Sequence, residues 1–371
     1  MTQATFIPGR ELSRLYYLEA VKPILDEAFP DLRYDATLID TGSEALGFDT
    51  PLSCDHGWGP RLRLFVSEAD HEQYAEAITG TLRQRLPVEF RGWPTSFVKG
   101  DDGSWILDAR TSGPVDHLVG VTTVQRLLHA ELNYAWEPGA VITPQDWLTF
   151  PQQKLRVITY APVYGEGLGD VAVMRAAFHY YPRDVWLYLL AAGWTRIGQE
   201  EPFVGRAGQV GDELGSRMIA ARLMRDLMML CFLIERVYAP YAKWFGSGFA
   251  RLASASRLNP VFERVLSARD WHARQDALAE AYQIVAGMHN ALGVTPLLPA
   301  QATPFYNRPF LVIHGERFAA ALIDAIDDDA VRQIAAHTLI GAIDQFSDST
   351  NLREQTDLRP ALRSLYDPDA K

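Results

Sequence analysis

Cysteine is scarce in this chain of 371 residues, which has only Cys54 and Cys231. The two lie far apart in the sequence, and neither belongs to a spacing typical of a metal site. The sequence therefore excludes a cysteine cluster for zinc or iron. Such sparse cysteine use is typical of a protein from the reducing cytoplasm.

Long apolar runs are also missing. The longest are VWLYLLAAGW at 185–194 and LMMLCFLI at 227–234, and both are much shorter than the roughly 20 residues that cross a bilayer. The first residues, MTQATFIPGRELSRLYYLEAVKP, mix charges with apolar side chains and do not resemble a signal peptide. We therefore expect a soluble cytoplasmic protein with no membrane partner.

Positive charge is in deficit, because 35 lysine and arginine residues face 46 aspartate and glutamate residues, for a net charge of -11. A protein of this charge has no global field that attracts a phosphate backbone, so nucleic acid is not an expected partner. Hydrophobic residues make up 48% of the chain, as in an ordinary globular protein. The length allows two or three domains.

Short strand patterns alternate with helices in residues 1–165. Helical spacing of apolar residues predicts a leading helix at 11–28, with Pro23 as a kink or boundary. Further strands are predicted at 36–40, 61–66, 88–90 and 95–98, and further helices at 68–86 and near 121–132. This order predicts an α/β domain built on a small mixed sheet.

The apolar period becomes helical after about residue 165. Long helices are predicted within 180–199, 213–240 and 277–293, so residues 166–300 are expected to form a helical bundle. Residues 301–371 carry one strand-like run, PFLVIHG, and two helical stretches, and are predicted to be a C-terminal extension packed on the other two parts. The predicted fold class is α+β.

The stretch TGSEALGFDTPLSCDHGW (41–58) carries the chemistry. Gly42-Ser43 ends an apolar run, where a glycine turn, a hydroxyl and backbone N–H groups allow close approach of a triphosphate. Asp55 follows with eleven residues between it and Ser43, just ahead of the strand RLRLFV. Residues i and i+2 of a strand share a face, so a second carboxylate at position 57 would complete a metal site. Gly57 stands there instead.

This pattern resembles the polymerase-beta nucleotidyltransferase superfamily, in which the Gly-Ser pair is followed by Asp-x-Asp or Asp-x-Glu. More specifically, four segments resemble a bacterial domain-of-unknown-function (DUF) family with a nucleotidyltransferase-like first domain and a helical second domain. These segments are 42–66, 180–217, 237–252 and 343–352. The resemblance implies transfer of a nucleoside monophosphate from a nucleoside triphosphate to a hydroxyl of an unknown, small-molecule acceptor.

The resemblance also implies roles for individual residues. Gly42 and Ser43 would hold the triphosphate, while Asp55 and Glu89 would act in catalysis as ligands of Mg²⁺. By fold-level analogy with antibiotic nucleotidyltransferases, a carboxylate of the helical domain could act as general base, and nearby side chains could meet a phosphate. The residues at matching places are Glu213, with Asp212 beside it, for the base, and Tyr241 and Lys243 for the phosphate.

Each of these signals has a purely structural alternative. Gly42-Ser43 also suits a tight turn, Asp55 a cap, and Glu213 the first turn of a helix. Asp49 or Glu44 could fill the gap left by Gly57. That gap motivates the competing hypothesis of a degenerate nucleotide- or ligand-binding protein on the same fold, because metal affinity depends on the number of charged ligands.

One further pair is open to a structural interpretation. Arg222 and Asp226 interrupt an apolar helix face one turn apart, which favours an ion pair within the helix over a place in a cleft.

Overall fold

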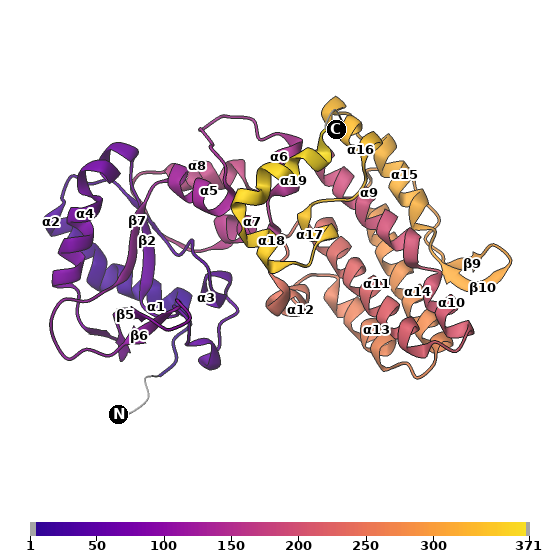
Figure 1. Ribbon diagram of the computed structural model, residues 1–371, viewed down its shortest axis with the longest axis horizontal. Coiled ribbons are helices and arrows are strands. Elements are labelled where there is room, and N and C mark those ends of the chain that lie inside the picture. The colour runs from indigo at the N-terminus through magenta and orange to yellow at the C-terminus, as the bar shows by residue number, and fades with distance from the viewer. Residues whose placement is uncertain (1–4, 369–371) are drawn as a thin grey trace. The chain divides into compact units, whose positions relative to one another are not determined.

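The computed structural model describes residues 5–368, which divide into two compact units. Unit 1 consists of the chain up to Ala140 together with Lys154–His179, and unit 2 of Val141–Gln153 together with the chain from Tyr180 onward. Residues 301–368, predicted as a separate extension, lie in unit 2. Figure 1 shows the elements of both units along the chain.

A four-stranded mixed sheet is the centre of unit 1. Its strand order is β7-β2-β1-β8, in which β2 runs parallel to β7 and β1 runs antiparallel to both of its neighbours. The four strands are β1 (Asp35–Thr37), β2 (Arg61–Phe65), β7 (Leu118–Thr122) and β8 (Val163–Glu166). The prediction of a small mixed sheet is confirmed.

Two hairpins accompany this sheet. Phe90 of β3 pairs with Trp93 of β4, and Lys99 of β5 pairs with Trp105 of β6. Their bounds are β3 (Glu89–Phe90), β4 (Trp93–Pro94), β5 (Ser96–Lys99) and β6 (Trp105–Asp108). The runs predicted as strands at 88–90 and 95–98 correspond to β3 and β5.

Helices cover the sheet of unit 1 and complete its core. The predicted leading helix is α1, a π-helical turn at Tyr17–Val21 and α2, with Pro23 in the first turn of α2. Its buried Tyr16 and Leu25 belong to the same core cluster as Leu62 and Leu64 of β2. The helices are α1 (Gly9–Tyr16), α2 (Lys22–Ala28), α3 (Ser43–Leu46), α4 (Glu68–Arg85), α5 (Val124–Leu132), α7 (Gln152–Tyr160) and α8 (Asp170–Ala177).

Unit 2 is a helical bundle, as the sequence predicts. The long helices α9, α11 and α14 pack together (Figure 1), and Leu223, Leu227 and Leu230 on the predicted apolar face of α11 are fully buried. The major helices are α9 (Arg183–Glu200), α10 (Phe203–Gln209), α11 (Glu213–Ile234), α13 (Ala255–Ser267), α14 (Trp271–Ala291), α15 (Gly315–Asp324) and α16 (Asp329–His337).

Shorter elements complete unit 2. The strand-like run near 309–315 is β10, which pairs with β9 in a hairpin that extends from the helices in Figure 1. These elements are α6 (Pro144–Thr149), α12 (Phe245–Phe249), β9 (Thr303–Phe305), β10 (Arg308–Val312), α17 (Ile343–Phe346), α18 (Thr350–Glu354) and α19 (Arg359–Arg363). Within residues 5–368, no helix combines the length and apolarity needed to span a membrane.

The predicted ion pair between Arg222 and Asp226 is wrong. Arg222 reaches Glu200 at the end of α9, while Asp226 pairs with Arg196 of α9 at 3.3 Å. Both bonds join α11 to α9. The packing of the two helices therefore decides these partners, although the spacing within α11 would also have allowed a pair.

Glu201 ties the end of α9 to the start of α15. Its carboxylate accepts backbone N–H groups of Ile313, His314 and Gly315, the last at 3.1 Å. The residue is only 5% exposed. Burial raises the pKa of Glu201 to about 7, against the opposite effect of the three amides.

We expect Glu201→Gln to flatten the pH dependence of unit 2 stability. Because the folded pKa of Glu201 lies above its ordinary value, its contribution is fully present below pH 4.5 and is lost as the pH rises through about 7. The free energy of unfolding of the wild type should fall relative to the variant by up to roughly 3 kcal/mol over that window. Urea unfolding followed by circular dichroism between pH 4.5 and 8 measures this difference. The exposed Glu263→Gln serves as the control, and parallel profiles for wild type and Glu201→Gln would contradict the expectation.

Candidate functional site

The Gly42-Ser43 turn follows β1 and leads into the short helix α3. Gly42 has φ of +120°, a region that side chains rarely adopt. A Cβ atom there would lie 2.6 Å from a carboxylate oxygen of Glu44 and 2.7 Å from the guanidinium of Arg61. Glycine is therefore required by the local backbone and packing, whether or not a phosphate binds.

A buried ion cluster lies beneath this turn. Arg61, at the start of β2, donates from Nε to Glu44 at 2.9 Å, pairs with Asp40 at 3.1 Å, and also donates to the carbonyl of Thr41. Arg63 pairs with the other oxygen of Asp40 at 3.0 Å. Arg61 and Arg63 share a face of β2 because they are two residues apart. The alternation in RLRLF is the sequence signal that places both arginines on one face.

Burial and charge set the ionisation of this cluster. Burial favours neutral Asp40, but the guanidiniums of Arg61 and Arg63 outweigh it and lower the pKa of this carboxyl. At Glu44 burial dominates and raises the pKa, despite the attraction of Arg61. Burial likewise opposes the charge of Arg61, yet Glu44 and Asp40 together raise its pKa. The cluster therefore holds a buried cation that its carboxylates compensate.

The other acids of the motif differ in their surroundings. Asp49 accepts the backbone N–H of Gly9 at 2.7 Å and the indole N–H of Trp58 at 3.0 Å, so it anchors the chain ahead of α1. Asp55 is 62% exposed, and its carboxylate lies 3.3 Å from the ring of His56. Both of these bonds to Asp49 engage Oδ2, and Glu44 is paired with Arg61. The alternative that Asp49 or Glu44 fills the gap at Gly57 stays a prediction.

Gly57 occupies a turn with φ of +76°. Its N–H donates to the carbonyl of Trp105 at the start of β6. The nearest heavy atom to a Cβ at this position would be the Cβ of Trp105, at 3.9 Å. The site therefore has room for a side chain at position 57, at the cost of backbone strain.

Glu89 lies in β3 with an exposed side chain. Among the described residues, no hydrogen bond or ion pair joins it to Asp55, and no group of three or more His, Cys, Asp or Glu side chains is placed to hold a metal ion. The predicted Asp55 and Glu89 metal site stays a prediction.

The residues predicted in the helical part all lie in unit 2. Glu213 accepts the backbone N–H of Trp271 and pairs with the fully buried Arg274 at 3.0 Å, while Asp212 caps α11 by accepting the N–H of Gly215. These contacts match the structural alternative. Lys243 lies 5.1 Å from the ring centroid of Trp244, and Tyr241 precedes the 3₁₀ turn that contains it. Their proposed catalytic and phosphate-binding roles stay predictions.

A pocket of about 620 Å³ in unit 1 brings together both ends of the motif. Thr41, which precedes Gly42-Ser43, and Gly57, which follows Asp55, both line it. Arg61 and Arg63 of β2, the edge strand β7 and Trp105 form further parts of the wall. This pocket has the size and the mixed polar and apolar lining of a small-molecule site.

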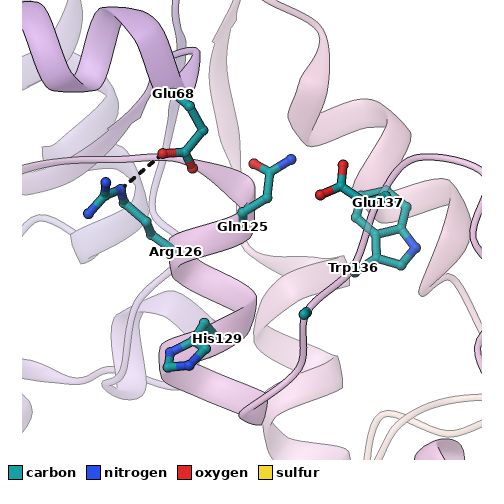
Figure 2. Close-up of a pocket in the computed structure, with 7 residues that line it drawn as sticks. Glu68, Gln125, Arg126, His129, Trp136 and Glu137 are labelled. Carbon is teal, nitrogen blue, oxygen red and sulfur yellow. Dashed lines mark hydrogen bonds and ion pairs between the residues drawn. The ribbon is translucent and has the colours of Figure 1, made fainter.

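A second pocket, of about 490 Å³, is lined by Glu68 at the start of α4, by one side of α5 and by the loop at 135–137 (Figure 2). Glu68 in its wall is paired with Arg126 at 3.2 Å, and Gln125, His129 and Glu137 stand around it. It contains no residue of the stretch 41–58, whereas Thr41, His56 and Gly57 of that stretch line the first pocket. The side chains of Ser43, Asp55 and Glu89 are not part of either lining. The first pocket is therefore the candidate functional site.

The geometry of the turn at Gly42 leads to a prediction about the free energy of unfolding. We expect Gly42→Ala to lower the free energy of unfolding by about 3 kcal/mol or more, because backbone strain of about 1–2 kcal/mol is joined by collision with Glu44 and Arg61. Gly113→Ala is the matched control, because Gly113 has φ of +94° but open space around its Cβ position. Urea unfolding should show the larger loss for Gly42→Ala. Equal losses would mean that the packing around Gly42 contributes nothing.

The ion cluster around Arg61 leads to a second prediction about the free energy of unfolding. Arg61→Met should cost about 3–5 kcal/mol, because it leaves the buried Glu44 without its cation and Asp40 with Arg63 alone. Arg83→Met removes an exposed pair with Asp116 and should cost less than about 1 kcal/mol. Adding Glu44→Gln to Arg61→Met should recover part of the loss in the same unfolding measurement. A double variant no more stable than Arg61→Met alone would show that buried charge is not the cause.

Comparisons with known proteins show a family match over part of the chain. No curated protein matches it. Among solved structures, it is similar to a nucleotidyltransferase-like protein from Exiguobacterium sibiricum 255-15, with 9% sequence identity, a TM-score of 0.32, and coverage of 76% of this chain and 77% of that one. Residues 147–245 match the family described as Domain of unknown function (DUF4037). The predicted resemblance to a domain-of-unknown-function family is thus confirmed, and in residues 147–245 the chain carries the DUF4037 segment.

Proposed function

We propose that unit 1 binds a nucleoside triphosphate together with one magnesium ion in the pocket that Thr41 and Gly57 line. The observation that carries this proposal is that the neighbours of the motif residues line one cavity: Thr41 stands beside Gly42-Ser43, and Gly57 follows Asp55 by two residues. The motif residues come from separate loops, one after β1 and one before β2. A cavity at this junction gives the phosphates, the ion and the base a common site.

Arg63 supports the anionic part of the proposal. Its side chain is 24% exposed and lines the pocket, and among the described residues only its Nη2 atom is engaged, by Asp40. A guanidinium has five N–H donors, so several remain for phosphate oxygens. Arg61 is fully committed to its carboxylates and contributes positive charge from beneath.

The available carboxylates support one ion better than two. Magnesium is usually held by one or two carboxylates together with substrate phosphates. Asp55 suits this role because its oxygens are exposed and its ion-pair partner is a single histidine, His56. Asp40, Glu44 and Asp49 serve the fold instead. Binding by a degenerate nucleotidyltransferase-like site is therefore the function that this geometry supports best.

Nucleotidyl transfer to an acceptor hydroxyl is the second candidate. The exposed carboxylates of Asp55 and Glu89 favour it, since neither is consumed by a buried ion pair. Under this hypothesis Glu213 would act as base and Tyr241 and Lys243 would meet the phosphate. Freeing Glu213 for that task would leave the buried Arg274 without its carboxylate.

Calorimetry with ATP, GTP, CTP and UTP, with and without Mg²⁺, tests nucleotide binding. We expect at least one nucleotide to bind only with Mg²⁺, and Asp55→Ala to weaken it about tenfold or more, because the ion loses its only protein carboxylate. Asp101→Ala, which removes an exposed acid outside the 41–58 motif, is the matched control and should bind like wild type. Absence of binding by the wild type to all four nucleotides would remove the proposal.

Restoring the missing carboxylate separates the two candidates. Gly57→Asp adds it where the structure leaves room, and Gly57→Asn adds the same shape with the same backbone strain but no charge. If the wild type only binds, it should release no pyrophosphate from the bound nucleotide, and Gly57→Asp should bind Mg²⁺ more tightly than Gly57→Asn. Steady pyrophosphate release by the wild type would instead show cleavage between the α- and β-phosphates, and recovery of less free nucleoside monophosphate than pyrophosphate would establish its transfer to an acceptor.

A further inference from the structure

Trp105 stands out among the tryptophans because it is 39% exposed, whereas Trp58, Trp136, Trp186 and Trp194 are almost completely buried. It begins β6 and lines the candidate pocket. A large apolar ring left partly in water at a cavity wall gains most from a flat partner. The position of Trp105 therefore suggests a ligand with an aromatic ring.

The β5–β6 hairpin turns this ring toward the motif. In its register Phe97 pairs with Leu107 and Lys99 pairs with Trp105, and these four side chains share one face of the hairpin. A Cβ at Gly59 would lie 2.9 Å from Leu107 and 3.0 Å from Phe97, so this face packs against the residues that follow Asp55.

The backbone of Trp105 is tied to the same loop. The N–H of Gly57 donates to the Trp105 carbonyl. Lys99 holds its ammonium 5.3 Å from the centroid of the indole ring and is not part of the pocket wall. A cation over one face positions the ring and leaves its other face for a stacking partner.

We propose that Trp105 is the platform on which the base of the bound nucleotide stacks, a role that rests on the nucleotide binding proposed above. Arg63 lies in the same pocket and suits the phosphates, so the indole and the guanidinium supply distinct subsites for the two ends of a nucleotide. The pocket volume of about 620 Å³ is sufficient for such a ligand.

The strand β7 supplies groups that can meet the edge of a stacked base. It lies at the edge of the sheet, and all five of its residues line the pocket. The outward N–H and C=O groups of an edge strand are not used by a neighbouring strand. In β7 the N–H of Val119 donates to the ring of His117 at 3.1 Å, so the other outward groups remain for a ligand. Gly120 in its middle has no side chain and is exposed, which leaves this backbone accessible.

A comparison of two ligands distinguishes the binding contribution of the base from that of the phosphates. Calorimetry compares the Mg²⁺ complex of each nucleotide with that of inorganic tripolyphosphate, for wild type, Trp105→Leu and Trp105→Phe. We expect Trp105→Leu to weaken the nucleotide about tenfold, in keeping with base stacking on an aromatic side chain, and to leave tripolyphosphate binding unchanged. Trp105→Phe should retain most of the nucleotide affinity because it keeps an aromatic ring.

Ile106→Ser is the matched control, because Ile106 is similarly exposed, at 43%, but points to the opposite face of the hairpin. It should bind both ligands like wild type. Equal nucleotide affinity in Trp105→Leu and wild type would overturn the platform while leaving the proposed function intact. A parallel loss of tripolyphosphate binding would also overturn it, and a wild type that binds neither ligand would remove the proposed function itself.

Fluorescence provides a readout that does not need the leucine variant to fold. Saturating nucleotide with Mg²⁺ should quench the tryptophan emission of the wild type, and this change should be absent from Trp105→Phe although that variant binds the nucleotide. Tripolyphosphate should produce no such quenching in the wild type. Identical quenching in wild type and Trp105→Phe would place the base away from Trp105.

Discussion

The candidate site depends on one interaction, the ion pairing of the buried Arg61 guanidinium with Glu44 and Asp40. A cation in the interior requires compensating charge, and Glu44 and Asp40 provide it from the loop that follows β1. Their attachment to Arg61 draws that loop onto β2. The same close approach leaves no space for a Cβ at Gly42, so the turn and its glycine follow from the ion cluster.

This arrangement also limits the chemistry of the site. Acids that satisfy a buried arginine or anchor the chain are not available to a metal ion, and Asp40, Glu44 and Asp49 are all used in this way. Asp55 is the exception because it lies in an exposed turn. The proposed function therefore assigns the metal ion to Asp55, because one carboxylate suits a single magnesium ion better than a pair.

In unit 2, too, the buried acids are occupied by structural partners. Glu213 compensates the buried Arg274, Asp226 compensates Arg196, and Glu201 holds the first amides of α15. Each of these acids connects two elements of the bundle. Their first role is therefore to specify helix packing, and a catalytic role for Glu213 would compete with it.

The sequence by itself determined most helices and strands, and it located the turn at Gly42-Ser43. Apolar periodicity predicts the leading helix, β2, α4 and the long helices of unit 2, because period and capping are properties of neighbouring residues. Gly42-Ser43, Asp55 and Gly57 were recognisable for the same reason: their meaning depends on local spacing. The α+β class follows from the order of these elements.

Only the tertiary structure decided which charges meet. Arg61 selects Glu44 and Asp40, Arg222 selects Glu200 rather than Asp226, and Trp105 joins Gly57 in one pocket wall. These partners are separated by many residues, and sequence spacing carries no information about such distances. Charge pairing depends on which surfaces the packing of strands and helices brings together, and that is settled only when the whole unit folds.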